Sequence, residues 1–222
     1  MKTCLGLHRK PRLAMPLISA QPSSTPLASD AGNDLRSLIL AASRDLLLAE
    51  GVDGLSMRKI AHKIGYSPTA LYLHFPHKDA ILHAHLDEGL GMLHRTLEEA
   101  LAAVDAADTD ARLRALAETY VRWGEANPAR YEVMFLLHPR HMERYPPEKF
   151  RMARRTLDLF SDVLVEAGFA AEVARVAGSA AWAQLHGFVA LQIARRFDVR
   201  LPADALRQTV VDSVVRGALA AR

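Results

Sequence analysis

The segment 55–82 contains two short helix patterns separated by a glycine, and this spacing constrains the fold more than any other feature. Ser56 precedes apolar residues at three-to-four spacing, so its hydroxyl is placed to accept an amide at a helix start. Gly65 supplies the left-handed conformation that ends this helix at low steric cost. Ser67 and Pro68 start another helix, because serine caps and proline suits the first helical turn. Two helices joined in this way form a helix-turn-helix, whose second helix fits the major groove of DNA.

Several runs in this segment match a known pattern. They are Arg58-Lys59-Ile60-Ala61, the Gly65 turn, Leu71-Tyr72-x-His74-Phe75 and Lys78-x-x-Ile81-Leu82. Together they resemble the DNA-binding segment of TetR-type repressors, without gaps over residues 55–82. In the C-terminal half the resemblance is mainly architectural, apart from Trp182-x-x-x-His186-Gly187, which is similar to a Trp-His-Gly signature in one branch of the family. The resemblance implies a transcriptional regulator and not an enzyme.

The resemblance also implies which side chains face DNA. Leu71 and Phe75 are four residues apart, so they would hold the second helix against its domain and leave another face outward. On that face Ala70 and Leu73 can meet thymine methyl groups, and a threonine can hydrogen-bond a base edge. The residues expected to contact DNA are Arg58, Ser67, Thr69, Ala70, Tyr72, His74 and Lys78. The alternative is a helical pair that packs against another protein.

The rest of the chain predicts helices, because caps, apolar three-to-four spacing and helix-ending Gly or Pro recur along it. The first should be capped by Asn33 or Asp34 and end at Gly51. After the two short helices, the expected ranges are 78–103, 109–127, 129–137, 148–167, 171–197 and 203–220. The prediction is an all-α fold of about nine helices. Its expected parts are a disordered basic tail (1–32), a DNA-binding domain (33–82) and a ligand-binding and dimerisation domain (83–222).

Charge, cysteine content and hydrophobicity constrain how the protein attracts DNA phosphates and in which compartment it works. The formal net charge is only +3, and residues 33–85 carry six basic side chains against five acidic ones, so attraction to phosphate depends on local placement. The single Cys4 cannot form an internal disulfide, which fits a reducing, cytoplasmic location. Residues 176–194 lack Asp, Glu, Lys and Arg, but Gln184 and His186 interrupt the run. We therefore expect a helix buried in a protein and no membrane partner.

Aromatic side chains of the C-terminal domain are candidates for a ligand site. The expected ligand-binding residues are Tyr120, Trp123, Phe135, Phe160, Trp182 and His186. Residues of this kind at helical spacing also form plain core, and a hydrogen-bonded buried histidine is the alternative for His186. Neither a metal site nor a cofactor is expected. Phe75-Pro76 breaks the helix between His74 and His77, and no second cysteine or carboxylate cluster completes a set of zinc ligands.

The last predicted helix has two apolar stripes, more than one core contact covers. One contains Val210 and Val214, and the other contains Val211 and Val215. The preceding helix is rich in alanine and glycine, so the two could pair with their copies as a four-helix bundle. We expect a homodimer interface at these four valines. The alternative is a monomer that buries both stripes internally.

The combined patterns predict a ligand-responsive regulator that binds double-stranded DNA, most simply a repressor. A small apolar inducer in the helical domain would change the dimer geometry and lower affinity for a pseudo-palindromic operator. One rival hypothesis is a helical enzyme that uses His186 with a nearby carboxylate. Another is a constitutive DNA-binding or adaptor protein without an inducer.

Overall fold

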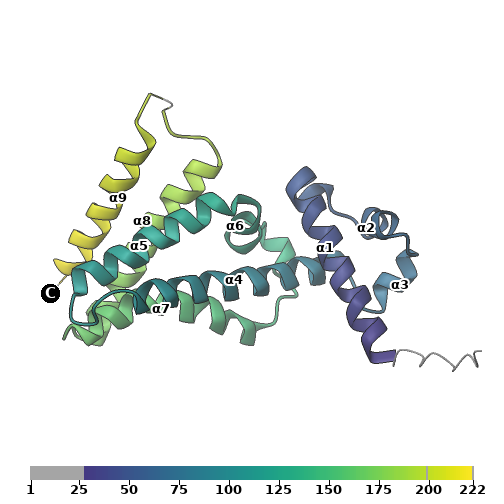
Figure 1. Ribbon diagram of the computed structural model, residues 1–222, viewed down its shortest axis with the longest axis horizontal. Coiled ribbons are helices and arrows are strands. Elements are labelled where there is room, and N and C mark those ends of the chain that lie inside the picture. The colour runs from purple at the N-terminus through teal and green to yellow at the C-terminus, as the bar shows by residue number, and fades with distance from the viewer. Residues whose placement is uncertain (1–27, 199, 222) are drawn as a thin grey trace, which may run out of the picture.

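The computed structural model describes residues 28–198 and 200–221, and within them the chain is helical with no strand (Figure 1). Nine α-helices and two short 3-10 helices make up this described part. They are α1 (Ala28–Gly54), α2 (Met57–Ile64), α3 (Pro68–Tyr72), α4 (Lys78–Ala102), α5 (Thr109–Ala126), α6 (Pro128–Phe135), η1 (Pro139–His141), η2 (Pro147–Lys149), α7 (Phe150–Glu166), α8 (Ala171–Ile193) and α9 (Ala203–Leu219). The all-α prediction is confirmed. Most of the predicted tail, residues 1–27, lies outside the described residues.

The helices form two groups that share α4. Helices α1 to α3 form a small N-terminal group, and α4 runs from it along the whole C-terminal group (Figure 1). Leu82, near the start of α4, is fully buried, and so is Leu97, near its end. Helix α4 packs against α1 on one side of the molecule and against α5, α6 and α7 on the other. The predicted boundary near residue 82 therefore falls inside a continuous helix.

Most helix ends agree with the sequence, and the exceptions have local causes. Helix α1 begins at Ala28, earlier than Asn33, and Gly51 interrupts its helical dihedrals with φ 68°. The cap of α5 is Asp108 and not Thr109, because Asp108 Oδ1 accepts the Ala111 amide at 2.9 Å. Helix α8 ends at Ile193, before the predicted Phe197, because Arg195 adopts φ 52°.

Small residues let the C-terminal helices pack closely. A Cβ added at Gly178 of α8 would lie 3.0 Å from the Ser161 backbone nitrogen of α7. A Cβ at Gly124 of α5 would lie 2.5 Å from Val189 Cγ1 of α8. Close approach of this kind lets α5 pack against α7, α8 and α9 and lie among them. Among the residues described, no helix is long and apolar enough to cross a membrane.

Candidate nucleic-acid interface and ligand region

The helix-turn-helix is built from the caps that the sequence predicts. Ser56 Oγ accepts the Lys59 amide at 3.2 Å, which starts α2. Gly65 ends α2 in the left-handed region (φ 74°, ψ 25°). Ser67 Oγ then accepts the Ala70 amide at 3.3 Å, with Pro68 in the first turn of α3. These local predictions are confirmed. The two serine caps and the Gly65 turn fix the angle at which α3 leaves α2.

Helix α3 is anchored on one side and exposed on the other. Leu71 and Phe75 are buried at 0% and 3% exposure, and the Arg36 guanidinium lies over the Phe75 ring at 5.1 Å. Leu73 is 83% exposed and Tyr72 is 52% exposed. The helix itself ends at Tyr72, so Leu73 and the residues after it lie in the turn that leads to α4. A short element thus presents a mostly uncharged outward surface.

The side chains predicted to contact DNA lie around this surface and differ in their exposure and in their hydrogen bonds. Thr69 is exposed, whereas Ala70 and His74 are half-buried. The Ser67 hydroxyl is used as a cap acceptor, which leaves its own proton free to donate. Lys78 Nζ donates to the Val52 carbonyl at 3.4 Å, so this ammonium is held beside the α1 end of the domain.

Cations on α2 fall into two classes. Lys59 is paired with Glu50, and Lys63 is paired with Asp45 at 3.1 Å. Arg58 is exposed and forms no ion pair within the described residues. Arg58 is therefore the α2 cation that is available to a phosphate without first breaking an internal pair.

The start of α4 has a cap that the sequence analysis missed. His77 Nδ1 accepts the Ala80 amide at 3.0 Å. This hydrogen bond requires a ring nitrogen without a proton, which a neutral imidazole supplies. A histidine directly before an apolar helix was the available sequence signal, but Ser, Thr, Asp and Asn are the usual caps.

Four of the six predicted ligand residues come together around Tyr131 of α6, an aromatic residue outside that set of six. The cluster, called the effector cluster below, consists of Tyr120, Tyr131, Phe135, Trp182 and His186. Trp182 Nε1 donates to Tyr120 Oη at 3.1 Å, the two tyrosine oxygens are 2.9 Å apart, and Tyr131 Oη lies 2.7 Å from His186 Nδ1. The Phe135 ring lies 4.9 Å from that of Tyr131. Rings and hydrogen bonds from α5, α6 and α8 thus meet at one place.

Burial sets the protonation of this cluster. It lowers the pKa of His186, so the ring is neutral near pH 7. It raises the pKa of Tyr120 to about 12 and raises the pKa of Tyr131 as well, so both hydroxyls keep their protons. The cluster is therefore uncharged, which suits a mainly apolar molecule better than an ion.

The other two predicted ligand residues lie outside this cluster. Trp123 is 7% exposed and Phe160 is 1% exposed, and neither makes a ring contact with the effector cluster in the described part of the chain. Phe160 lies in the α7–α8 packing, beside Gly178. Helical spacing places all six predicted residues in the C-terminal group of helices but does not identify the face on which each lies.

Three of the four predicted dimer valines are buried within a single chain. Val211, Val214 and Val215 are at most 2% exposed within a single chain, because they face α5 and α8, and Val210 is half-buried. Val211 and Val215 therefore fill the chain's own core, whereas Val210 and Val214 also line grooves between α8 and α9. Two of the exposed apolar residues lie on α8, where Val176 is 64% exposed and Leu191 is 45% exposed. Grooves of about 410 and 470 Å³ run between α8 and α9 beside them.

The N-terminal and C-terminal groups are joined by polar contacts around α4. Arg44 of α1 binds Glu88 at 3.3 Å, and Arg140 of η1 binds Asp53 at 3.3 Å. His85 is 8% exposed and its Nε2 lies 2.8 Å from Ser43 Oγ of α1. Within the described residues, no three His, Cys, Asp or Glu side chains gather as a metal site requires.

Two family models match the sequence. The model described as "Bacterial regulatory proteins, tetR family" matches residues 39–85, and "Tetracyclin repressor-like, C-terminal domain" matches residues 113–214. Together they cover about two-thirds of the chain. The first spans the helix-turn-helix, and the second includes the effector cluster and much of α9.

Individual relatives agree. The tetracycline repressor protein class A from transposon 1721 of Escherichia coli is 48% identical over 46 residues, 21% of each chain, so this chain matches about a fifth of that repressor. YobS of Bacillus subtilis (strain 168), an uncharacterized HTH-type transcriptional regulator, is 26% identical over 163 residues, which cover 72% of this chain and 80% of YobS. A solved structure of a protein with unknown function from Rhodococcus sp. RHA1 has a TM-score of 0.70 at 27% identity, and covers 89% of this chain and 98% of that one.

The exposed α3 and its caps define a helix-turn-helix DNA-binding protein with an appended helical domain. The chain belongs to the TetR family of transcriptional regulators, which are DNA-binding proteins and not enzymes. The family that the sequence motifs predicted is confirmed.

A first prediction concerns His85, which faces Arg44 and Ser43 of α1, Glu88 of α4 and Arg130 of α6. Burial lowers its pKa from 6.5 to about 4, with Glu88 opposing the shift and the two arginines adding to it. As the pH falls, His85 is therefore protonated in the unfolded chain before it is protonated in the folded chain. Stability from the neutral ring is complete above pH 6.5 and decreases as the pH approaches 4.

Between pH 7.5 and 5.0 this single group should cost about 2 kcal/mol of unfolding free energy. The His85→Gln variant keeps a side-chain amide that can hydrogen-bond Ser43, but it cannot titrate. Over the same pH interval, its unfolding free energy should therefore decrease by about 2 kcal/mol less than that of the wild type. Urea unfolding at both pH values measures the difference. His186 is present in both proteins, so its contribution cancels, and equal losses would show that His85 is not the titrating group.

Proposed function

We propose that this protein is a homodimeric repressor that binds a pseudo-palindromic operator and is released from it by a small, mainly apolar molecule. The observation that carries the proposal is the outward surface of α3 and the turn after it. Leu73 has the largest exposed fraction among the large hydrophobic side chains described, on an element whose other side is fixed by Leu71 and Phe75. Rigid anchoring with an exposed, weakly charged face suits the wall of a major groove.

Each predicted DNA contact receives a role from its chemistry. Thr69 can hydrogen-bond a base edge, and the methyl groups of Ala70 and Leu73 can meet thymine methyls. Phosphate contacts fall to side chains around this face, which position the protein without specifying sequence. They are Arg58, Ser67, Tyr72, His74 and Lys78.

The direct test is selection from a pool of random-sequence DNA duplexes by the purified protein. We expect enrichment of a two-fold symmetric motif with half-sites about one helical turn, or a multiple of it, apart, because two copies present two recognition helices. Substituting Thr69→Ala should relax the preference at one base pair of each half-site. Enrichment of a motif without symmetry, or no enrichment beyond the starting pool, would contradict a dimeric repressor.

The effector cluster supports the ligand part of the proposal. Its rings come from three helices, its polar groups are hydrogen-bonded to one another, and Phe135, Trp182 and His186 remain half-exposed. A mainly apolar molecule that packs against these rings would change how α6 sits on α5 and α8. Since TetR-type proteins generally hold a small molecule in this domain, the cluster is the place where we expect the inducer.

The face formed by α8 and α9 supports the dimer. Ala180, Ala183 and Gly187 of α8 leave little side-chain bulk between Val176 and Leu191. Two grooves beside this strip could each receive side chains of a second copy. A pair of helices with small residues and exposed apolar groups suits a two-fold four-helix bundle.

Replacing Val176 with arginine should therefore weaken the dimer without unfolding the chain. Val176 is 64% exposed, so the arginine is solvated in the monomer and would be desolvated only in the interface. We expect sedimentation to show at least a tenfold weaker dimer. Val165→Arg is the matched control, because Val165 is 44% exposed on α7. An unchanged dimer in Val176→Arg, or dissociation by Val165→Arg, would move the interface elsewhere.

A further inference from the structure

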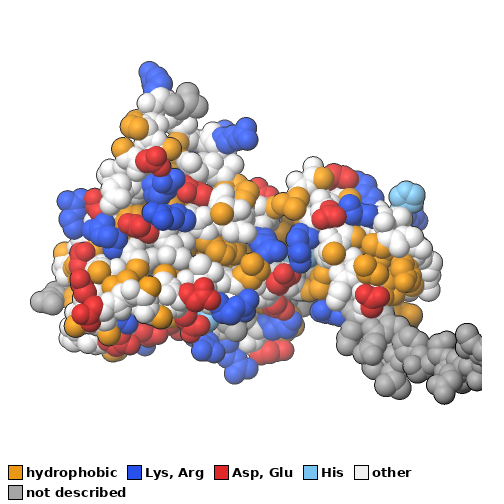
Figure 2. All heavy atoms as spheres, in the orientation of Figure 1, with side chains coloured by type: hydrophobic (Ala, Val, Ile, Leu, Met, Phe, Trp, Pro, Cys, Tyr) orange, Lys and Arg blue, Asp and Glu red, His pale blue; other side chains and the backbone are white. Residues whose placement is uncertain are grey.

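We infer that a cavity between α1, α4 and α6 binds a small amphipathic molecule with a single carboxylate. This cavity, called the junction cavity, has a volume of about 330 Å³, at the small end of ligand-sized pockets. It lies where the N-terminal helices meet the C-terminal domain, and none of the predicted ligand residues lines it. Basic and hydrophobic side chains gather at this junction on the visible face (Figure 2).

Among the described residues that line the cavity, positive charges outnumber negative charges by one. Arg44 and Arg130 both approach Glu88, at 3.3 Å and 3.8 Å. His85 also lines the cavity, but its low pKa keeps it neutral near pH 7. Two guanidiniums against one carboxylate give a net charge of about +1 near neutral pH. A single carboxylate on a ligand would balance this charge, whereas a phosphate dianion would exceed it.

Hydrogen-bond donors are also left over. The Nε of Arg44 is buried and has no hydrogen-bond partner among the residues that the structure describes. Arg130 Nη1 points to the Met92 sulfur at 2.8 Å, and a thioether is only a weak acceptor. A carboxylate is the acceptor that a guanidinium prefers, often through two parallel hydrogen bonds. The two arginines therefore provide stronger binding for a carboxylate than for a neutral amide.

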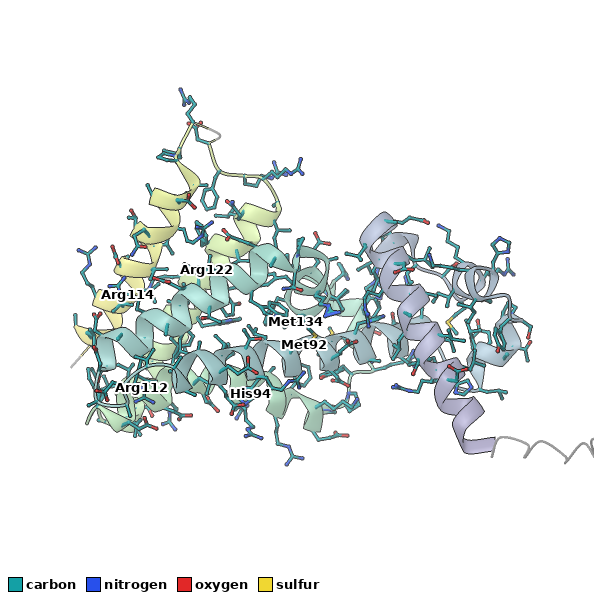
Figure 3. All side chains as sticks on the ribbon, viewed as in Figure 1. Met92, His94, Arg112, Arg114, Arg122 and Met134 are labelled. Carbon is teal, nitrogen blue, oxygen red and sulfur yellow. The ribbon has the colours of Figure 1, made fainter. Side chains whose placement is uncertain are left out.

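Apart from Asn127, the rest of the wall is apolar, so the ligand should also carry an apolar group. Leu47 and Leu48 come from α1, Met92 from α4 and Val133 from α6. Leu48 is 66% exposed, so a bound apolar group would remove a leucine from water. In Figure 3, Met92 and Met134 lie at the end of the C-terminal domain that faces α1. An alkyl or aryl chain fits this wall better than a sugar or a nucleotide.

The junction cavity is separate from the effector cluster because α6 stands between them. Arg130 and Val133 line the cavity, whereas Tyr131 and Phe135 belong to the cluster. At 100° per residue these two pairs lie on opposite sides of α6. A ligand in the junction cavity would touch α1 of the DNA-binding domain directly. It would thereby favour one orientation of α1 relative to α6.

The regulatory consequence rests on the proposed function, but binding itself can be tested without DNA. The probes are octanoate and 4-phenylbutyrate, each titrated calorimetrically into the full-length protein beside its own primary amide. We expect each acid to bind at least tenfold more tightly than its amide. Arg130→Met, which keeps the apolar stem, should weaken acid binding at least tenfold. Arg122→Met is the matched control, an exposed arginine on α5 away from the junction (Figure 3), and should change binding less than twofold.

A second variant tests location independently of charge. Ala129→Trp places a large ring from α6 into the cavity while both arginines remain, so acid binding should again decrease at least tenfold. Circular dichroism verifies that each variant is folded. Equal affinity for acid and amide, or unchanged acid affinity in a folded Arg130→Met or Ala129→Trp protein, would overturn the inference. Operator selection does not depend on these probes, so it can succeed when this inference fails, and the reverse.

Discussion

Helix α4 is the element on which the rest of the structure depends. Ile81 and Leu82 are fully buried near its start, beside the helix-turn-helix, and Leu93 and Leu97 are fully buried in the C-terminal domain. The His77 cap fixes where the helix begins, directly after the turn that follows α3. Since a continuous helix is stiff over this length, a displacement of its C-terminal part changes the orientation of the DNA-binding domain. Recognition and regulation therefore share one covalent connection.

The contacts around the start of α4 show how tightly the domains are joined. His141 Nδ1 lies 2.7 Å from Asp79 Oδ1, and His83 Nε2 lies 2.6 Å from the His141 carbonyl oxygen. Arg140 adds an ion pair to Asp53 at the end of α1. The segment after α6 is thus attached to both groups of helices. Under the proposed function, a movement of α6 would reach the helix-turn-helix through this segment and through the residues that line the junction cavity.

Local rules predicted much of this protein, and three-dimensional neighbours decided the rest. Ser56, Gly65 and Ser67 act within four residues of their own positions, so their roles were visible in the sequence. The burial of Val211 and Val215 was not, because apolar stripes look alike whether they face α5 or a second copy. The sequence did not single out Tyr131 from the other aromatic residues for a related reason. Its importance comes from two hydrogen-bond partners 11 and 55 residues away, which no local pattern reveals.

The central claim is that α3 and the turn after it lie against DNA. The most direct measurement is site-specific photocrosslinking, with p-benzoylphenylalanine in place of Leu73 and, in a separate protein, in place of Val165 on α7. Both proteins are irradiated with a random-sequence duplex pool under conditions in which they bind it. The account predicts covalent protein–DNA adducts from position 73 and background levels from position 165. Equal adducts from the two positions, or none from position 73 while DNA is bound, would contradict it.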